Sequence, residues 1–390
     1  IYLPGGPPHQ DMYDLKMDAP SNVRGEFSPI STKVPGIRIC EHLPRMAAMA
    51  DKLVFVNSLV GSIGQHASFQ CTTGRSSNNQ PAGGWPERGT VISRLQGGEK
   101  ETVPSYINLS PKMKHSPYNF GKNSFVGVSH RAFMPLGDTK SDMTLQGITM
   151  ERLEDRRRLL KSFDGLRRNL DASGMMEGMD AFQEEAFDLL TSSRLLEALD
   201  LSKEDPKIRE RYGKGTSKVQ GDAAPRMNEQ FLVARRLVEA GARVVTVSYS
   251  FWDWHGSNFA RAKENFPDFD QALTALVEDL HQRGMADDTT VIAWGEFGRM
   301  PTINKNAGRD HWPRVANALL ACGGMRTGQV IGTTDRMGGE ADERPVHFQE
   351  IFATLYHNMG IDINKATLPD LSGRPQFLVD TEHQPLPEVI

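Results

Sequence analysis

Several short apolar runs in the chain predict buried strands. The runs are rich in β-branched and aromatic residues, and turn residues lie near their ends. They cover residues 1–3, 52–61, 105–110, 242–249, a stretch within 287–301, and 316–324. Because these runs are apolar rather than alternating, we expect strands that are buried on both faces of a sheet.

A second pattern, with apolar residues three and four positions apart, predicts helices over residues 39–52, 264–284 and 347–360. A shorter helix is expected within residues 67–75, ending near Gly74. Strands alternate with helices through the C-terminal half. This order predicts an α/β fold with a mostly parallel central sheet and helices on both faces.

Residues 149–241 differ from the rest because three successive stretches show the helical pattern. Their runs of Lys, Arg and Glu are typical of solvated helix faces rather than of binding patches. We therefore predict one α/β domain over residues 1–390, with a mostly helical insertion at 149–241.

The composition is that of a folded globular protein, with 390 residues, 38% hydrophobic and 24% charged. The net charge of −4 and the lack of a basic block argue against a nucleic-acid partner. No apolar run approaches the roughly 20 residues of a membrane-spanning helix. We expect neither nucleic-acid binding nor a membrane span.

The two chain features that bear on the cell compartment are the first residue and the cysteines. Ile1 is not Met and lies in an expected strand, so we expect that the N-terminus has been cut away, with any targeting signal upstream. Cys40, Cys71 and Cys322 form no CxxC motif and leave an odd count. We expect three small buried side chains, without a disulfide framework or a zinc–cysteine site.

Polar residues follow the expected strands at the points where binding sites form in open α/β sheets. They are His9 and Asp11, then Ser62 and His66, then Asp253, His255 and Asn258, then Glu296 and Arg299, and finally Asp310 and His311. Imidazoles with carboxylates suit Zn²⁺, Mn²⁺ or Fe, and carboxylates alone suit Mg²⁺ or Ca²⁺. We therefore expect a divalent-metal site at this edge, where two ions roughly 3.5–4 Å apart would clamp a phosphoryl or sulfuryl group.

Asp253 and His255 are two positions apart in WDWH, so in an extended segment both side chains point to one side and reach one ion. The alternative is a structural turn flanked by two tryptophans. Glu296 is an acid at a strand end, which is costly unless it binds a metal or a partner. The alternative there is an ion pair with Arg299.

The segment GRDHWP offers His311 as a further metal ligand. Asp310 would then orient a ligand or pair with Arg309. Arg299 and Arg309 are candidates for holding an anionic substrate by bidentate hydrogen bonds.

Six segments together resemble a bacterial family called domain of unknown function 1501. They are GGPPHQDMYDLK, TTGR, WDWHGSNF, GEFGRMP, GRDHWP and GGMRTGQVIGTTD, and the similarity covers nearly the whole chain. That family is grouped with the alkaline phosphatase-like superfamily, alongside sulfatases and cofactor-independent phosphoglycerate mutases. The resemblance implies a three-layer α/β sandwich with a bimetal centre at the strand ends. Because members often follow a twin-arginine signal, it also implies a periplasmic or extracellular location.

The superfamily's metal ligands can be carried over position by position. The first acidic ligand matches Asp11, with Asp14 as a fallback, and the Asp-plus-His pair matches Asp253 and His255, although the usual spacing is wider. The later acidic ligand is kept as Glu296, while Phe297 replaces its neighbour, and the late histidine matches His311.

The nucleophile departs most from the superfamily. Counting back from Thr73-Gly74, its position falls on Gly64, or with a small gap on Ser62 or His66. Cys71 is too close to Thr-Gly, and no C-x-P-x-R motif is present, which argues against sulfatase-type formylglycine. His66 would instead be a metal ligand in the vacated place or, less simply, a nucleophile.

These residues suggest a metal-dependent hydrolase of phosphate or sulfate esters, in small anionic molecules or in an exported polysaccharide. A metal-bound hydroxide would attack directly and would need no side-chain nucleophile. The alternative is a catalytically degenerate binding or structural protein on the same fold, favoured by the missing nucleophile and the missing second ligand after Glu296. The fold alone does not decide between them.

Overall fold

The computed structural model describes residues 1–98, 103–135 and 193–390. The α-helices are α1 (His9–Met12), α2 (Ser21–Arg24), α3 (Pro44–Ala48), α4 (Phe69–Thr73), α5 (Arg88–Gln96), α8 (Ser193–Leu199), α9 (Pro206–Tyr212), α10 (Glu229–Glu239), α11 (Asn258–Gln282) and α12 (Phe348–Asn358). Short 3₁₀ helices cover Ala50–Lys52, Ser116–Tyr118, Val128–His130 and Leu201–Lys203.

The strands of the central sheet are β3 (Leu53–Val60), β8 (Thr290–Trp294), β11 (Ala316–Cys322), β12 (Gln329–Ile331) and β15 (Val346–His347). The others are β1 (Pro29–Ser31), β2 (Arg38–Cys40), β4 (Tyr106–Asn108), β5 (Gly215–Val219), β6 (Pro225–Met227), β7 (Val244–Thr246), β9 (Gly298–Arg299), β10 (His311–Trp312), β13 (Thr333–Thr334), β14 (Ala341–Glu343), β16 (Thr367–Pro369) and β17 (Pro375–Phe377).

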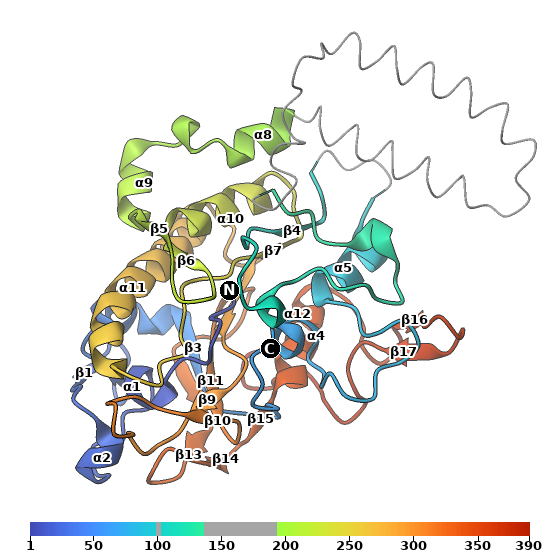
Figure 1. Ribbon diagram of the computed structural model, residues 1–390. Coiled ribbons are helices and arrows are strands. Elements are labelled where there is room, and N and C mark those ends of the chain that lie inside the picture. Colours follow the sequence, from blue (N-terminus) through green and yellow to red (C-terminus); the bar gives the residue numbers. More distant parts are fainter. Residues whose placement is uncertain (99–102, 136–192) are drawn as a thin grey trace, which may run out of the picture.

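The central sheet has the order β12-β3-β11-β8, and β15 also pairs with β3. β11 is antiparallel to both β3 and β8, whereas β12 and β15 are parallel to β3. The sheet is therefore mixed, with β11 running against its neighbours (Figure 1).

The parallel pair β4–β7 is joined to this sheet by the first residues of the chain. Tyr2 forms a parallel bridge to Ser248 beyond β7 and another to Trp294 at the end of β8. Residues 1–3, which precede a glycine-rich loop, thus lie between β7 and β8. The predicted site residues follow the carboxyl ends of these two strands. This placement brings the loop that follows residue 3 to the same edge.

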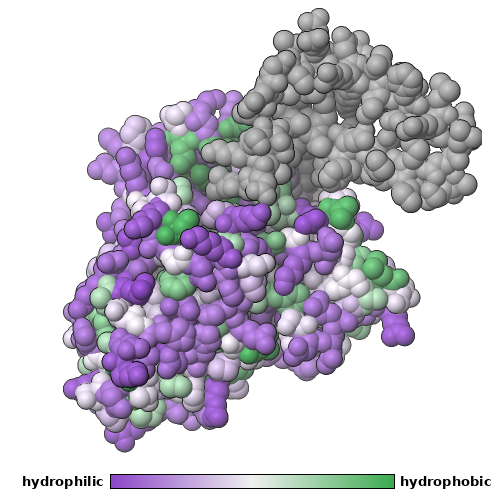
Figure 2. Space-filling view, in the orientation of Figure 1, coloured by the Kyte–Doolittle hydropathy of each residue, from purple (hydrophilic) through white to green (hydrophobic). Residues whose placement is uncertain are grey.

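Helices cover both faces of the sheet, and the strand residues alternate between them. Leu53 and Phe55 of β3 pack in one apolar cluster with α3, α10 and α11, while Val54 and Val56 pack in another with α5 and α12. A strand that is buried on both sides needs a continuous apolar run, which explains the composition of β3. In Figure 2 the visible surface is mainly hydrophilic, with hydrophobic residues in small separate groups.

Most predicted elements are present, with one clear exception. The helix predicted over residues 39–52 is correct only in its later part: residues 38–40 form β2, which pairs with β1, and the helix α3 begins at Pro44 and is followed by a 3₁₀ helix over Ala50–Lys52. The helix predicted at 264–284 begins earlier, since α11 covers Asn258–Gln282. Gly74, with φ of +74°, ends α4 as expected.

The predicted insertion at 149–241 is described only from residue 193 onward; the remainder lies outside the described residues. The described part holds α8, α9, α10 and the hairpin β5–β6. None of the helices in the described parts of the chain combines the length and hydrophobicity that a membrane span requires. The alkaline phosphatase-like three-layer sandwich stays a prediction.

Candidate metal centre

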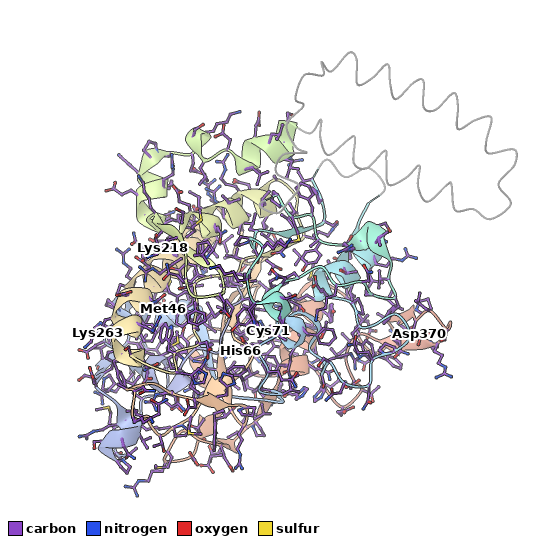
Figure 3. The ribbon with its side chains drawn as sticks, in the orientation of Figure 1. Met46, His66, Cys71, Lys218, Lys263 and Asp370 are labelled. Carbon is purple, nitrogen blue, oxygen red and sulfur yellow. The ribbon has the colours of Figure 1, made fainter. Side chains whose placement is uncertain are left out.

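Four predicted site residues meet at one point: His66, Asp253, His255 and His311. Each offers one ligand atom, and these atoms all lie within 4.8 Å of one another. His66 follows β3, Asp253 and His255 follow β7, and His311 begins β10. We call these four residues the histidine–aspartate cluster. His66 is labelled near the centre of Figure 3.

The donor atoms of this cluster have the spacing of a metal site. His255 Nε2 lies 2.9 Å from Asp253 Oδ1 and 3.1 Å from His311 Nε2, and His311 Nε2 lies 3.3 Å from Asp253 Oδ1. On the other side, His66 Nε2 lies 3.3 Å from Asp253 Oδ2. Bonds of about 2.0–2.2 Å in a tetrahedron place neighbouring donors roughly 3.4 Å apart. The four residues therefore fit a single ion after a small expansion.

The local sequence WDWH explains how Asp253 and His255 come to face the cluster. Trp252 and Trp254 are almost fully buried, and their rings stack at 5.1 Å with an interplanar angle of 26°. Because side chains alternate in an extended segment, the residues between and after the tryptophans point to the opposite side. The two tryptophans therefore anchor this segment in the core, while Asp253 and His255 face the cluster.

Glu296 does not belong to the cluster but contacts its histidine. Its side chain is 1% exposed, both oxygens accept hydrogen bonds from the Gly5 N–H at 2.9 and 3.1 Å, and Oε1 lies 3.1 Å from His66 Nδ1. A Cβ on residue 5 would lie 2.3 Å from the backbone nitrogen of Asp253, so only glycine permits this approach. The predicted ligand Glu296 is placed as the group that orients His66.

Burial alone would lower the pKa of His66, but hydrogen bonds to Asp253 and Glu296 outweigh it and raise the pKa to about 9. Burial would raise the pKa of Asp253, yet hydrogen bonds from His311, His66 and Arg299 hold it well below its usual range. Without a metal, Asp253 is therefore an ionised carboxylate, and near neutral pH His66 is a cation with a proton on both ring nitrogens. A divalent cation would replace one of these protons.

Arg299 is fully engaged by the protein and holds Asp253 in place. Its guanidinium donates to Asp253 Oδ1 at 2.5 Å, to the carbonyl of Gly6 at 2.9 Å, to that of Arg309 at 2.9 Å, and to that of Gly5. The side chain is 1% exposed. The prediction that Arg299 grips substrate is not supported by this placement, because its donors already have partners. The predicted Glu296–Arg299 ion pair is not formed; Arg299 pairs with Asp253 instead.

Asp310 contacts His255, as expected if it orients that ring, and does not pair with Arg309 in the described residues. Its Oδ1 lies 2.7 Å from His255 Nδ1, which leaves Nε2 of that ring for the cluster. Hydrogen bonds from His255 and Asn304 lower the pKa of Asp310. His255 and His66 are thus arranged alike: one ring nitrogen contacts a carboxylate outside the cluster, Asp310 or Glu296, and the other contacts Asp253 within it.

Asp11 lies away from the cluster, in contrast to its prediction as the first metal ligand. Both oxygens bind Arg309, at 2.7 and 2.8 Å, and Asn258 donates a further hydrogen bond at 2.8 Å. The side chains of Asp11 and Arg309 are 1% and 0% exposed. Arg309 therefore neutralises a buried carboxylate instead of reaching a substrate. The fallback Asp14 is also engaged, by Lys16 at 2.9 Å and by Thr334.

The candidates for a nucleophile have other roles. Ser62 Oγ donates to the Glu296 carbonyl at 2.6 Å. Cys71 is buried, and burial raises its pKa well above the usual range, so it is a poor nucleophile. Gly64, where the superfamily position falls, has φ of +68° and packs near Pro313. Of these candidates only His66 lies in the cluster.

Sequence analysis missed Tyr118 and His115. The Tyr118 hydroxyl lies 2.8 Å from His66 Nδ1, and His115 Nε2 lies 3.2 Å from the His66 carbonyl. Both come from the loop after β4, far from any motif, and follow no pattern of spacing that would identify them. Phe297 also borders the site, with its ring centroid 4.5 Å from that of His311.

A second group of potential ligands, Asp380, Glu382 and His383, lies near the C-terminus. Here Asp380 already pairs with Arg75 and accepts from Gln349 at 2.7 Å, and the His383 ring stacks on His347 at 4.2 Å. These partners leave the group less suited to an ion than the histidine–aspartate cluster.

Comparison with known proteins gave one result for the whole chain. A family model described as "Protein of unknown function (DUF1501)" matches residues 1–390. The search of curated proteins gave no match. The family part of the resemblance seen in the sequence is thus confirmed.

Proposed function

The chain belongs to the DUF1501 family of proteins of unknown function, and on that premise we propose that it is a metal-dependent hydrolase of phosphate or sulfate esters. The observation that carries the proposal is the convergence of three imidazoles and one carboxylate from three separate segments of the chain. The grouping of this family with the alkaline phosphatase-like superfamily is part of the same proposal.

The three imidazoles and one carboxylate of the cluster favour a transition metal. Imidazole nitrogens suit Zn²⁺, Mn²⁺ or Fe better than Mg²⁺ or Ca²⁺, which prefer all-oxygen sites. His66, Asp253, His255 and His311 would hold the ion, while Glu296 and Asp310 would fix the orientation of two of the rings. One ion fits these four residues, and Asp11, which was expected to be the first acidic ligand, pairs with Arg309 instead.

The chemistry proposed is direct hydrolysis. When bound, the ion supplies a water of lowered pKa and polarises the ester oxygen. The protein's own part is to hold Asp253 with Arg299, to hold His66 between Glu296 and Tyr118, and to keep the cluster reachable. Side chains of the cluster are 18–46% exposed, so an ester at the surface of a larger anionic polymer can approach.

The setting of the reaction follows from the family resemblance. We propose that the protein acts outside the cytoplasm, in the periplasm or beyond, on an anionic small molecule or a polysaccharide ester. Neither Ser62 nor Cys71 is arranged to form a covalent intermediate, which favours direct hydrolysis by water over attack by a side-chain nucleophile.

A specific observation favours a second function, that of a binding or structural protein with one structural metal or none. Arg299 and Arg309, the two arginines expected to hold an anionic substrate, are both occupied by the protein itself. Under this second proposal the cluster would bind an ion without turnover.

Metal content and ester hydrolysis, measured together, test the first proposal. We expect about one equivalent of Zn, Mn or Fe by plasma mass spectrometry in protein purified without chelator, and hydrolysis of p-nitrophenyl phosphate or sulfate. His311→Ala should lose both, whereas His357→Ala, at an exposed position on α12, should keep both. If His311→Ala keeps the full metal content of the wild type, the metal does not bind at the histidine–aspartate cluster, and the proposed site is wrong. Bound metal with no turnover of any ester supports the second function.

A further inference from the structure

A loop over residues 302–307 connects the motif GEFGRMP with the motif GRDHWP. It lies against the segment that follows WDWH. The Ser257 N–H donates to the Asn306 carbonyl at 2.9 Å, and the Asn258 N–H donates to the Ala307 carbonyl at 2.8 Å. The loop therefore ties together WDWH and GRDHWP, which between them carry three of the four residues of the histidine–aspartate cluster.

The side chain of Asn304 lies at the centre of these contacts. Its Oδ1 accepts from the N–H groups of Asn306 at 2.9 Å and Gly308 at 3.0 Å. Its Nδ2 donates to the His255 carbonyl at 3.0 Å and to Asp310 Oδ1 at 3.1 Å. An asparagine amide has two donor hydrogens and two acceptor lone pairs, so all four are used, and the partners fix which atom is oxygen. Asn304 thus joins the backbone of His255 to the carboxylate that contacts the ring of His255.

His255 needs such support more than the other cluster residues do. Its side chain is 46% exposed, the largest fraction among the four, and the side chain of its partner Asp310 is 45% exposed. A contact between two exposed polar side chains stabilises little by itself, because both must be ordered. His66 and Asp253, in contrast, are held by almost fully buried partners. The position of the His255 ring therefore depends on what holds Asp310.

The backbone of the loop is fixed closely enough to give this support. The Asn304 N–H donates to the Gly308 carbonyl at 2.9 Å, and the Ala307 N–H donates to the Asn304 carbonyl at 3.0 Å. Ala307 has φ of +53°, which is unfavourable for a residue with a Cβ and persists only where its surroundings over-determine it. A Cβ on residue 308 would lie 2.1 Å from the carbonyl carbon of His255, so the loop packs directly on the His255 backbone.

We propose that Asn304 is a positioning residue of the metal centre. It holds the His255 backbone and the Asp310 carboxylate in one arrangement, so that Nε2 of His255 points to the ion and Nδ1 to Asp310. This role rests on the metal site of the proposed function and does not depend on which ester is cleaved. Asn304 acts on the ion only through His255 and Asp310.

The first test is a pair of single variants and their combination. Zn²⁺ affinity is measured by competition with a chromophoric chelator, and the visible spectrum of bound Co²⁺ reports the ligands around the ion. Asn304→Ala should lower the affinity about tenfold and shift the Co²⁺ spectrum toward that of His255→Ala. In the His255→Ala background the same change should lower the affinity less than about twofold, because the ring through which Asn304 acts is already absent.

A second variant separates positioning from the folding of the loop. Asn304→Asp keeps the oxygen that accepts from the two loop amides, but it replaces the donor with an oxygen that faces the Asp310 carboxylate. We expect the affinity for Zn²⁺ to fall here too, while the thermal midpoint stays closer to that of the wild type than in Asn304→Ala. Asn306→Asp adds the same charge at an exposed position of the loop and should change the affinity less than about twofold.

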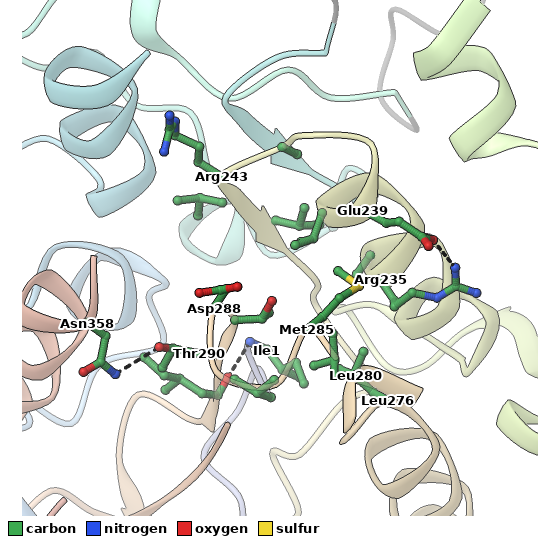
Figure 4. A pocket seen from close by; sticks show the side chains of 18 of the residues that line it. Ile1, Arg235, Glu239, Arg243, Leu276, Leu280, Met285, Asp288, Thr290 and Asn358 are labelled. Carbon is green, nitrogen blue, oxygen red and sulfur yellow. Dashed lines mark hydrogen bonds and ion pairs between the residues drawn. The ribbon is translucent and has the colours of Figure 1, made fainter. Parts of the chain in front are cut away.

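Asn358 offers a matched control at the other end of β8. Its Nδ2 donates to Thr290 Oγ1 at 3.1 Å, the contact marked in Figure 4, and it is half-buried like Asn304. Thr290 begins β8, whereas Glu296 and the cluster lie beyond its carboxyl end. Asn358→Ala should therefore lower the thermal midpoint without changing the Zn²⁺ affinity or the Co²⁺ spectrum.

Two results would overturn the role of Asn304 alone: an unchanged affinity in Asn304→Ala, or an equal loss of affinity with and without His255. The second result would mean that Asn304 only stabilises the loop. In both cases the wild type still binds its ion, so the proposed site stands. A wild type that binds no ion overturns the metal centre and the role of Asn304 with it, and this is seen before any variant is made.

Discussion

Asp253 and Asp11 begin from similar sequence signals and reach opposite environments. Each is an acidic residue that follows an apolar strand predicted from the sequence, although Asp11 lies in the short helix α1. Asp11 is fully buried, and Arg309 takes both of its oxygens. Asp253 is 20% exposed and is shared by three imidazoles and one guanidinium. A carboxylate that is neutralised by a buried arginine is fixed, whereas one that faces imidazoles can exchange their protons for a cation.

Because of this difference, mutations at the two sites should affect different properties of the protein. Removing one partner of a buried ion pair leaves an unpaired charge in the interior, which is strongly destabilising. Removing a group beside a partly exposed metal site changes mainly the affinity for the ion. Stability and metal binding should therefore respond to different residues.

The largest effect is expected at the Asp11–Arg309 pair. Arg309→Ala should lower the free energy of unfolding by about 3–5 kcal/mol, because it strands the Asp11 carboxylate and removes hydrogen bonds to the Val23 and Pro301 carbonyls. Urea unfolding followed by circular dichroism measures the change. Arg314→Ala, which breaks the exposed pair with Glu340, is the control and should cost less than about 1 kcal/mol.

The folded fraction of Arg309→Ala should still bind metal with the wild-type stoichiometry. If this variant is too unstable to purify, Arg309→Lys, which keeps a charge but loses the bidentate contact, takes its place. A variant of normal stability that has lost its metal would show that Arg309 belongs to the ion site after all.

An intermediate effect is expected at Glu296. Glu296→Gln keeps the size of the side chain but weakens the hold on His66, and should reduce the affinity for Zn²⁺ or Mn²⁺ by about 10–100-fold. Isothermal titration calorimetry gives the affinity, with Glu26→Gln, on the exposed pair with Lys263, as the control. An unchanged affinity with lower stability would mean that Glu296 serves only to fix Gly5.

The smallest effect is a pH dependence of metal binding. The pKa of His66 is raised to about 9, so this ring carries a proton at lower pH and must release it to bind an ion. Affinity should therefore rise with pH, by up to about tenfold per unit, and level off above about 9. Titrations between pH 7.5 and 9.5 follow this change. His66→Ala should flatten the curve, while His357→Ala should leave it as in wild type; a flat wild-type curve would be inconsistent with a proton on His66.

Much of the cluster could be predicted from the sequence because its signals are local. Asp253 and His255 share one short extended segment, and both residues, like His66, follow apolar runs that were predicted to be strands. The same holds for β3, whose apolar run is unambiguous. The predictions that were wrong concern residues whose roles depend on distant partners. The role of Asp11 is decided by Arg309, 298 positions away, and neither residue carries a mark of that pairing.

The first part of the helix predicted at 39–52 was wrong for a related reason. Its apolar spacing is helical, but residues 38–40 pair with β1, and the partner strand overrides the local pattern. Tyr118 was missed because a tyrosine after a turn has no distinguishing neighbours. Its importance arises only when the loop after β4 meets the loop after β3.

The separation of the cluster residues along the chain has a consequence for how the protein matures. His66 and Glu296 are 230 positions apart, and the ion site also needs His311. An unfinished or partly folded chain cannot assemble these ligands, because closing so long a loop requires the sheet between them. Metal binding would thus occur late in folding, after the whole domain has formed. An ion that binds only that state would then slow its opening and keep the finished molecules folded.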